Sequence, residues 1–279
     1  MTTDKTFFNK YPLSNYFILT FVISWGAILM LVGPDGIPVA PDQAVTLGMA
    51  ILLGPSITSL LLIGLTSGRT GFRELLSRLF KWRVDLRWYA VALLTAPLST
   101  AVVVFALSFF SSEFTSSIFI SDGKMALLLM GIVAGVVVGF FEELGWTGFA
   151  IPRMRLRYGV LATGLIVGLV WGLWHFILFW EEDSFSGILP LALLLARLFS
   201  WLPAYRVLMV WVYDSTESLF VVILMHTVLV ATLMILDPVL SGGGLVVFIL
   251  VRAAVLWVIA AMLTVARRQK FEIARNSQT

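Results

Sequence analysis

Four ionisable side chains lie in apolar stretches of the sequence, where charge is costly. Glu142 and Glu143 are adjacent within GIVAGVVVGFFEELGWTGFA, and the only two histidines of the chain, His175 and His226, also lie in apolar runs. A charge at the centre of a bilayer costs about 2.5–3.5 kcal/mol on insertion scales, so such residues usually mark functional sites. Carboxylates and imidazoles can transfer protons, and an imidazole can also bind a metal or stabilise an oxyanion. We predict one catalytic site made of these four residues, in which Glu142 deprotonates a water molecule and Glu143 orients or pairs.

Membrane-spanning helices must position these residues. The chain is 59% hydrophobic and has a mean hydropathy of +0.98, whereas soluble domains are about 45–50% apolar. The absence of cysteine excludes disulfides, thiolate metal sites and a cysteine nucleophile. We predict an all-α integral membrane protein in which residues 1–279 form a single polytopic domain. Because about 20 apolar residues cross a bilayer, the sequence predicts eight transmembrane helices, at about residues 15–33, 44–66, 88–110, 124–150, 160–180, 188–209, 217–236 and 243–265.

Charge supports this number of spans. If both termini are cytoplasmic, all but three of the 19 lysine and arginine residues fall in cytoplasmic segments, and Arg206 is counted among them. The exceptions are Lys124, Arg197 and Arg252, and the opposite loops are mainly acidic. This asymmetry follows the positive-inside rule and predicts an integral protein of a bacterial plasma membrane. The basic residues are thereby explained by the membrane, so nucleic acid is not expected as a partner. Residues 69–87 are predicted to form an amphipathic helix on the membrane surface.

Residue spacing places the candidate site near the middle of the membrane. Glu142 lies 16 residues before a predicted turn at residues 158–159, and His175 lies 16 residues after it. Antiparallel helices of equal rise bring the two to one level, so we expect Glu142 and His175 to face each other. His226 reaches a similar depth in its own span. Glycines recur every fourth residue before both Glu142 and His175, a pattern typical of closely packed membrane helices.

Three sequence segments resemble the CPBP family, the intramembrane proteases related to CAAX prenyl endopeptidases and to bacteriocin-processing and abortive-infection proteins. They read GFFEELGWTGFAIPRM, WGLWH and YDSTESLFVVILMH, and the similar core covers about residues 125–236. The resemblance implies an eight-helix bundle with an intramembrane polar cavity. It further implies an endopeptidase that hydrolyses a peptide bond of a membrane-associated or prenylated substrate. In this interpretation Glu142 and His175 activate water, while His226 stabilises the oxyanion or holds a metal.

Two positions depart from the family pattern. Thr147 stands where the family commonly has an arginine, so Glu143 lacks a cation on its own helix, and we expect Arg197 or Arg252 to supply that charge. Val230 stands where an asparagine or aspartate is common, and it cannot form a side-chain hydrogen bond.

The sequence leaves open whether the site holds a metal and which class of function the protein has. Glu142, His175 and His226 could together hold a zinc ion, although a metal-free mechanism uses the same residues with fewer conflicts and is slightly preferred. A CPBP-fold immunity or binding protein without catalysis, or a proton-coupled transporter, are the alternative functions. The expected partners are the lipid bilayer and a peptide or lipidated peptide. Substrate identity and oligomeric state are left open.

Overall fold

The computed structural model describes residues 8–38, 40 and 43–276, and every regular element in this part of the chain is helical. The longer helices are α2 Pro12–Val32, α3 Ala44–Ile51, α4 Leu53–Thr66, α5 Gly68–Leu79, α6 Leu86–Ser108, α8 Lys124–Gly145, α10 Val160–Trp174, α12 Ile188–Leu195, α13 Leu202–Thr216, α14 Leu219–Leu236 and α15 Gly242–Asn276. Shorter helical segments are η1 Pro34–Gly36, η3 Ser112–Phe114, α7 Ser117–Ile120, α9 Ile151–Arg155 and α11 Phe176–Phe179. Two π-helical turns, η4 Trp146–Ala150 and η5 Ala196–Ser200, interrupt longer helices.

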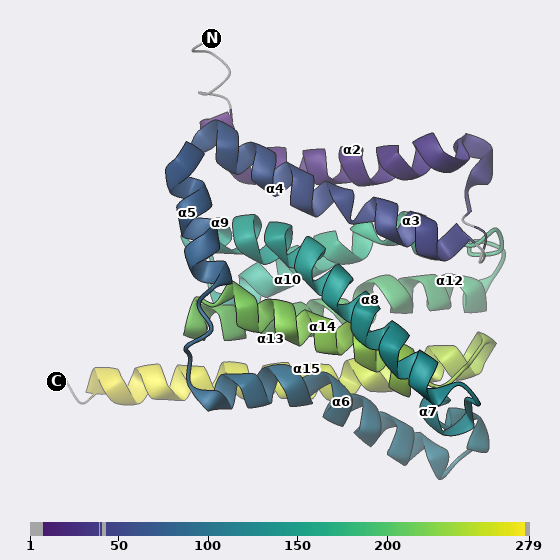
Figure 1. Ribbon diagram of the computed structural model, residues 1–279. Helices are drawn as coiled ribbons and strands as arrows, with labels where there is room; N and C mark the ends of the chain where they lie inside the picture. Colours follow the sequence, from purple (N-terminus) through teal and green to yellow (C-terminus); the bar gives the residue numbers. More distant parts are fainter. Residues whose placement is uncertain (1–7, 39, 41–42, 277–279) are drawn as a thin grey trace.

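The helices run back and forth along one axis and form a bundle (Figure 1). Helix α2 begins and α15 ends at the same end of the bundle, which also carries α5 and α9, while α7 lies at the other end (Figure 1). Within the described residues, seven helices are long and apolar enough to cross a membrane. This confirms the prediction of an all-α integral membrane bundle. The termini themselves, residues 1–7 and 277–279, lie outside the described residues.

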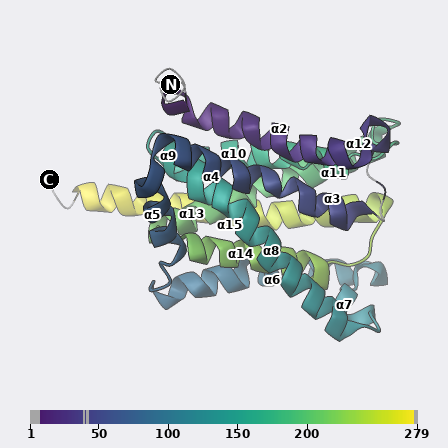
Figure 2. The same ribbon diagram turned by 45° about the horizontal axis from the view of Figure 1, so that its top comes forward.

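The predicted span at 160–180 is the one that falls short of a full crossing as a single helix. Helix α10 has 15 residues, which corresponds to about 22 Å at 1.5 Å per residue, less than the roughly 30 Å of a hydrocarbon core. His175 follows it, and α11 continues for four residues. The two together run from the α9 end toward the α12 end (Figures 1 and 2). The structure thus has long apolar helices at seven of the eight predicted spans, and a shorter helix at the eighth.

The predicted span at 188–209 is longer in the structure. It comprises α12, η5 and α13 and extends from Ile188 to Thr216. Consequently Arg206 lies inside this span and is fully buried, so its assignment to the cytoplasmic residues was wrong. The predicted span at 188–209 already included Arg206, although the charge count placed this residue with the cytoplasmic segments. A buried arginine is tolerated here because the carboxylate of Glu143 neutralises its charge inside the protein.

The two glycine ladders allow close helix packing, as predicted, but they do not pack against each other. Helix α8 crosses α14 obliquely (Figures 1 and 2), and a Cβ atom added at Gly135 would lie 2.3 Å from the carbonyl oxygen of Thr227. Helix α10 packs against α13, where a Cβ atom added at Gly164 would lie 2.5 Å from Cα of Val207. Each ladder thus fixes a different neighbour, and α13 and α14 bring further side chains to the site.

Replacing Gly135 by alanine is expected to destabilise the protein. The added methyl group would clash with the backbone of α14, and overpacking of this kind costs about 1–3 kcal/mol, more than the gain in helix propensity. Gly159→Ala is the matched control, because nothing lies within 4 Å of a Cβ atom there. Thermal unfolding of the detergent-solubilised variants measures the difference. Equal unfolding temperatures for both variants would contradict the close approach of α8 and α14.

The predicted amphipathic segment 69–87 is not one helix: α5 ends at Leu79, a stretch without regular structure follows it, and α6 begins at Leu86. Leu75 is buried, whereas Leu76, Phe80 and Trp82 are exposed beside basic residues. This distribution agrees with a position at the membrane surface.

Candidate active site

The candidate site is formed where four helices meet. Glu142 and Glu143 lie in the last turn of α8, His226 lies in the middle of α14, and Arg206 lies in α13. Each of these side chains exposes 2% or less of its surface. Trp171 on α10 closes the group and is equally buried. The structure therefore brings together three of the four predicted residues and adds an arginine and a tryptophan.

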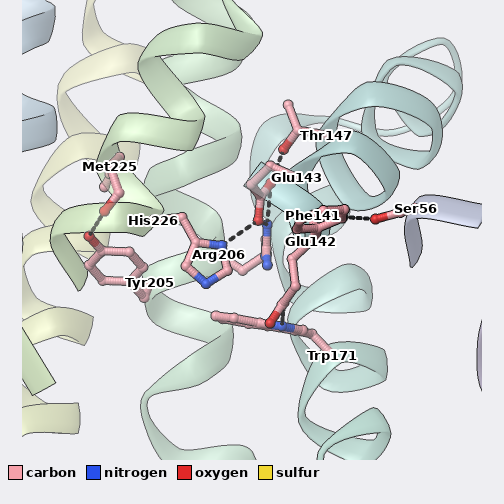
Figure 3. Close-up of polar contacts among 10 residues, drawn as sticks. All are labelled: Ser56, Phe141, Glu142, Glu143, Thr147, Trp171, Tyr205, Arg206, Met225 and His226. Atoms are coloured by element: carbon pink, nitrogen blue, oxygen red, sulfur yellow. Dashed lines mark hydrogen bonds and ion pairs between the residues drawn. The ribbon is translucent and has the colours of Figure 1, made fainter. Parts of the chain in front are cut away.

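Glu143 is the centre of a buried ionic network (Figure 3). Nη1 of Arg206 donates to both carboxylate oxygens, at 2.8 Å to Oε1 and 3.0 Å to Oε2. Nδ1 of His226 lies 2.8 Å from Oε1, and the hydroxyl of Thr147 donates to Oε2. A buried carboxylate requires a counter-charge and hydrogen bonds to be tolerated, and these three partners provide both. Glu143 thus pairs with Arg206 and contacts His226, in agreement with the predicted pairing and orienting role.

Glu142 points away from this network and toward Trp171 (Figure 3). The indole Nε1 donates to Oε2 of Glu142 at 2.6 Å. The indole ring also meets the imidazole of His226 edge to face, with ring centroids 5.4 Å apart. Glu142 therefore has one oxygen fixed by a neutral donor, and its other oxygen makes no hydrogen bond within the described residues.

His175 does not contact Glu142 as expected. Its Nδ1 lies 2.8 Å from the backbone oxygen of Trp171, and no hydrogen bond or ion pair joins it to either glutamate in the described part of the chain. Its ring packs against Trp171 and Trp174, with centroid distances of 5.4 Å and 4.7 Å. Both side chains instead contact Trp171, Glu142 through the indole nitrogen and His175 through the ring.

The hydrogen bonds determine which imidazole nitrogens carry protons. A carbonyl oxygen only accepts, so Nδ1 of His175 is the donor and Nε2 has the lone pair in the neutral ring. The carboxylate of Glu143 likewise accepts from Nδ1 of His226. Both histidines thus use Nδ1 to fix the ring and leave Nε2 for chemistry.

A π-helical turn follows the two glutamates directly. Residues Trp146–Ala150 form η4, and such turns occur frequently at functional sites. A Cβ atom at Gly145 would lie 2.3 Å from the hydroxyl oxygen of Tyr16, so α2 and α8 are in close contact here. Thr147 lies in this turn, and its hydroxyl donates to Glu143 four residues earlier. Nothing in the apolar pattern of this segment indicates a π-helical turn.

The cation that pairs with Glu143 was missed in the sequence. Arg197 pairs with Glu181 at 2.6 Å, and Arg252 pairs with Asp237, so neither supplies the charge as predicted. Arg206 supplies it instead. An arginine within the apolar run LPAYRVLMVWVY could have indicated a buried partner, in the same way as the glutamates did. Val230 lies one turn after His226 on α14 and adds no polar group.

The tentative zinc ligands do not fit a metal site in this arrangement. Among the described residues, no three histidine, aspartate or glutamate side chains come together as metal ligands. Oε2 of Glu142 accepts from Trp171, Nδ1 of His175 is bound to a backbone oxygen, and Nδ1 of His226 is bound to Glu143.

Comparison with known proteins finds similarity in the central segment of the chain. Residues 124–232 match a family described as Type II CAAX prenyl endopeptidase Rce1-like. The chain is also 27% identical over 188 residues to a protein of Methanococcus maripaludis named CAAX prenyl protease 2. That alignment covers 63% of this chain and 66% of the relative, slightly less than two thirds of its length. The matches confirm the resemblance to the CPBP family, and the matched segment contains all four predicted site residues.

Proposed function

We propose, from the confirmed resemblance of residues 124–232 to the CAAX prenyl endopeptidases, that this chain is an intramembrane endopeptidase. One structural observation carries the proposal. Glu142 is buried with one oxygen free of protein partners, next to a His226 that Glu143 orients. An acceptor and an oriented imidazole at one buried place are what water-dependent peptide hydrolysis requires. The name of the relative favours a prenylated peptide as the first substrate to test.

In the proposed reaction Glu142 is the general base. Its carboxylate takes a proton from a water molecule, and the resulting hydroxide adds to the carbonyl carbon of the peptide bond. The carbonyl oxygen becomes an oxyanion in the tetrahedral intermediate. When the C–N bond breaks, the proton held by Glu142 passes to the leaving nitrogen, and the carboxylate is regenerated. Trp171 fixes Oε2 of Glu142, so Oε1 is the atom assigned to the water.

His226 is assigned to the oxyanion. With Nδ1 donating to Glu143, the protonated imidazole presents an Nε2–H group to the developing negative charge. A carboxylate behind a histidine has the same orienting effect in serine proteases. His175 shares Trp171 with Glu142, so we assign to it the positioning of that tryptophan and a second proton acceptor at Nε2.

We also propose that the end of the bundle with α5 and α9 faces the cytoplasm. Arg78, Arg153 and Arg155 lie at this end, while Glu181 and Asp237 lie in segments at the opposite end. This follows the positive-inside rule. Labelling of single cysteines with a membrane-impermeant maleimide in intact cells tests the orientation, since the natural chain has no cysteine.

Thr147 and Val230, which depart from the family pattern, are the residues that favour the alternative of a protein without catalysis. Arg206 supplies the cation that Thr147 does not, so only Val230 still favours this alternative.

Replacing Trp171 by phenylalanine is expected to reduce peptide hydrolysis while the protein stays folded. The change keeps the ring but removes the donor to Glu142, and a hydrogen bond to a charged group contributes about 1.5–3 kcal/mol, or roughly 10- to 150-fold in rate. Cleavage of a fluorogenic prenylated peptide in proteoliposomes measures it. Trp180→Phe is the matched control, because the indole nitrogen of Trp180 makes no hydrogen bond within the described protein. Equal rates for the two variants would contradict the role of Trp171.

A further inference from the structure

Arg206 connects the two halves of the site. Its Nη1 contacts both carboxylate oxygens of Glu143, which in turn holds His226. The carbon of the same guanidinium lies 4.1 Å from the centre of the Trp171 ring, whose Nε1 holds Glu142. One fully buried cation therefore touches the partner of the proposed base and the partner of the proposed oxyanion donor (Figure 3).

The position of this cation differs from the family pattern. The family commonly has an arginine at the place of Thr147, on the same helix as the glutamates. Here Thr147 contributes a hydroxyl to Oε2 of Glu143, and the positive charge comes from α13. Because α13 is buried along almost its entire length, Arg206 is held firmly by the helices around it. In this chain the positive charge beside Glu143 therefore comes from a different helix.

Stability alone does not explain this arginine. A buried ion pair contributes little net stability relative to well-packed apolar residues, because both charges are removed from water. Moreover, Nε and Nη2 of Arg206 make no hydrogen bond within the described residues. A buried arginine with a purely structural role is expected to use all its donors.

We propose that Arg206 is a positioning residue, which holds Glu143 so that its Oε1 accepts the Nδ1 proton of His226 and directs Nε2 toward the reacting group. This proposal rests on the proposed function for its consequence in catalysis, but the geometry that it predicts can be measured without a substrate. It makes Arg206 the replacement for the in-helix arginine that Thr147 lacks.

The test moves the charge back to the glutamate helix. Four proteins are compared in nanodiscs: the wild type, Arg206→Ala, Thr147→Arg and the double variant. Since Thr147 already reaches Glu143, and Arg206→Ala frees space beside it, the double variant can form the pair from α8. We expect Thr147→Arg to lower kcat in the wild-type background, where two cations would crowd one carboxylate. The same substitution should raise kcat in the Arg206→Ala background.

The second readout is the ¹⁵N NMR spectrum of the imidazoles, which the presence of only two histidines makes simple. A His175→Gln variant assigns the two rings. In the wild type we expect the Nδ1 proton of His226 to be protected from exchange with water. In Arg206→Ala we expect this proton to exchange with water, and in the double variant we expect it to be protected again. If Arg206→Ala does not fold, Arg206→Lys and the double variant provide the comparison with the wild type.

The outcomes separate the two proposals. An unchanged His226 spectrum in folded Arg206→Ala, or a double variant with kcat no higher than that of Arg206→Ala, overturns the positioning role while the protease assignment stands. A wild type that cleaves no peptide overturns the proposed function. In that case the NMR comparison still decides whether Arg206 orients His226.

Discussion

Glu142→Gln is expected to lower the rate of peptide hydrolysis by about 10²–10⁴-fold, the usual contribution of a general base. Glutamine keeps the size of the side chain and can still accept the hydrogen bond from Trp171, but it cannot take a proton from water. Glu142 pairs with no cation within the described residues, so its neutral replacement leaves no buried charge without a partner. We therefore expect the unfolding temperature to stay close to that of the wild type.

Initial cleavage rates in proteoliposomes measure this effect, with substrate varied so that kcat and KM are separated. Glu182→Gln is the matched control, since Glu182 lies exposed in the segment after Trp180. A Glu142→Gln variant with wild-type kcat would disprove the role of this residue as the base.

Glu143→Leu is expected to destabilise the protein by about 3–5 kcal/mol, which is the cost of leaving one member of a buried ion pair without its partner. The guanidinium of Arg206 is fully buried, and Glu143 is its ion-pair partner. The variant also removes the acceptor for Nδ1 of His226, so hydrolysis should be lost in any protein that still folds. The two adjacent glutamates thus differ in the expected result: Glu142 affects the rate, and Glu143 affects both stability and rate.

The double variant Glu143→Leu/Arg206→Met separates the two effects. Replacement of a complete buried ion pair by apolar residues is often neutral or stabilising, so the unfolding temperature should return toward the wild-type value. Catalysis should not return, because His226 would remain without its orienting carboxylate. Reversible unfolding in mixed micelles measures the stability of all four proteins. A double variant as unstable as Glu143→Leu would show that these residues contribute independently.

Much of the bundle could be predicted because the membrane imposes simple rules. Apolar length predicted most spans within a few residues. The even number of crossings, which the loop charge indicates, stays a prediction. The span that ends at Thr216 was predicted to end at residue 209, and Arg206 within it was counted with the cytoplasmic residues. Its partner Glu143 lies 63 residues away in the sequence, so the pair that keeps Arg206 inside the protein could not be predicted.

The grouping of three site residues could be predicted, but not the contacts within the site. Counting residues along a helix predicts a common depth for Glu142 and His175, since each residue rises by a constant amount, but it does not predict which way a side chain points. Rotation about the helix axis depends on packing, and here the glycine ladders direct α8 toward α14 and α10 toward α13. Glu142 and His175 both contact Trp171 instead of each other.

Direct detection of peptide-bond hydrolysis distinguishes a protease from a binding protein or a transporter. Wild type and Glu142→Gln are incubated in proteoliposomes with a defined prenylated peptide in H₂¹⁸O, and the products are analysed by mass spectrometry. We predict that the wild type releases two fragments with one ¹⁸O atom in the new carboxyl terminus, and that the variant releases almost none. An intact peptide with the wild type, or equal cleavage by both proteins, would contradict hydrolysis at Glu142.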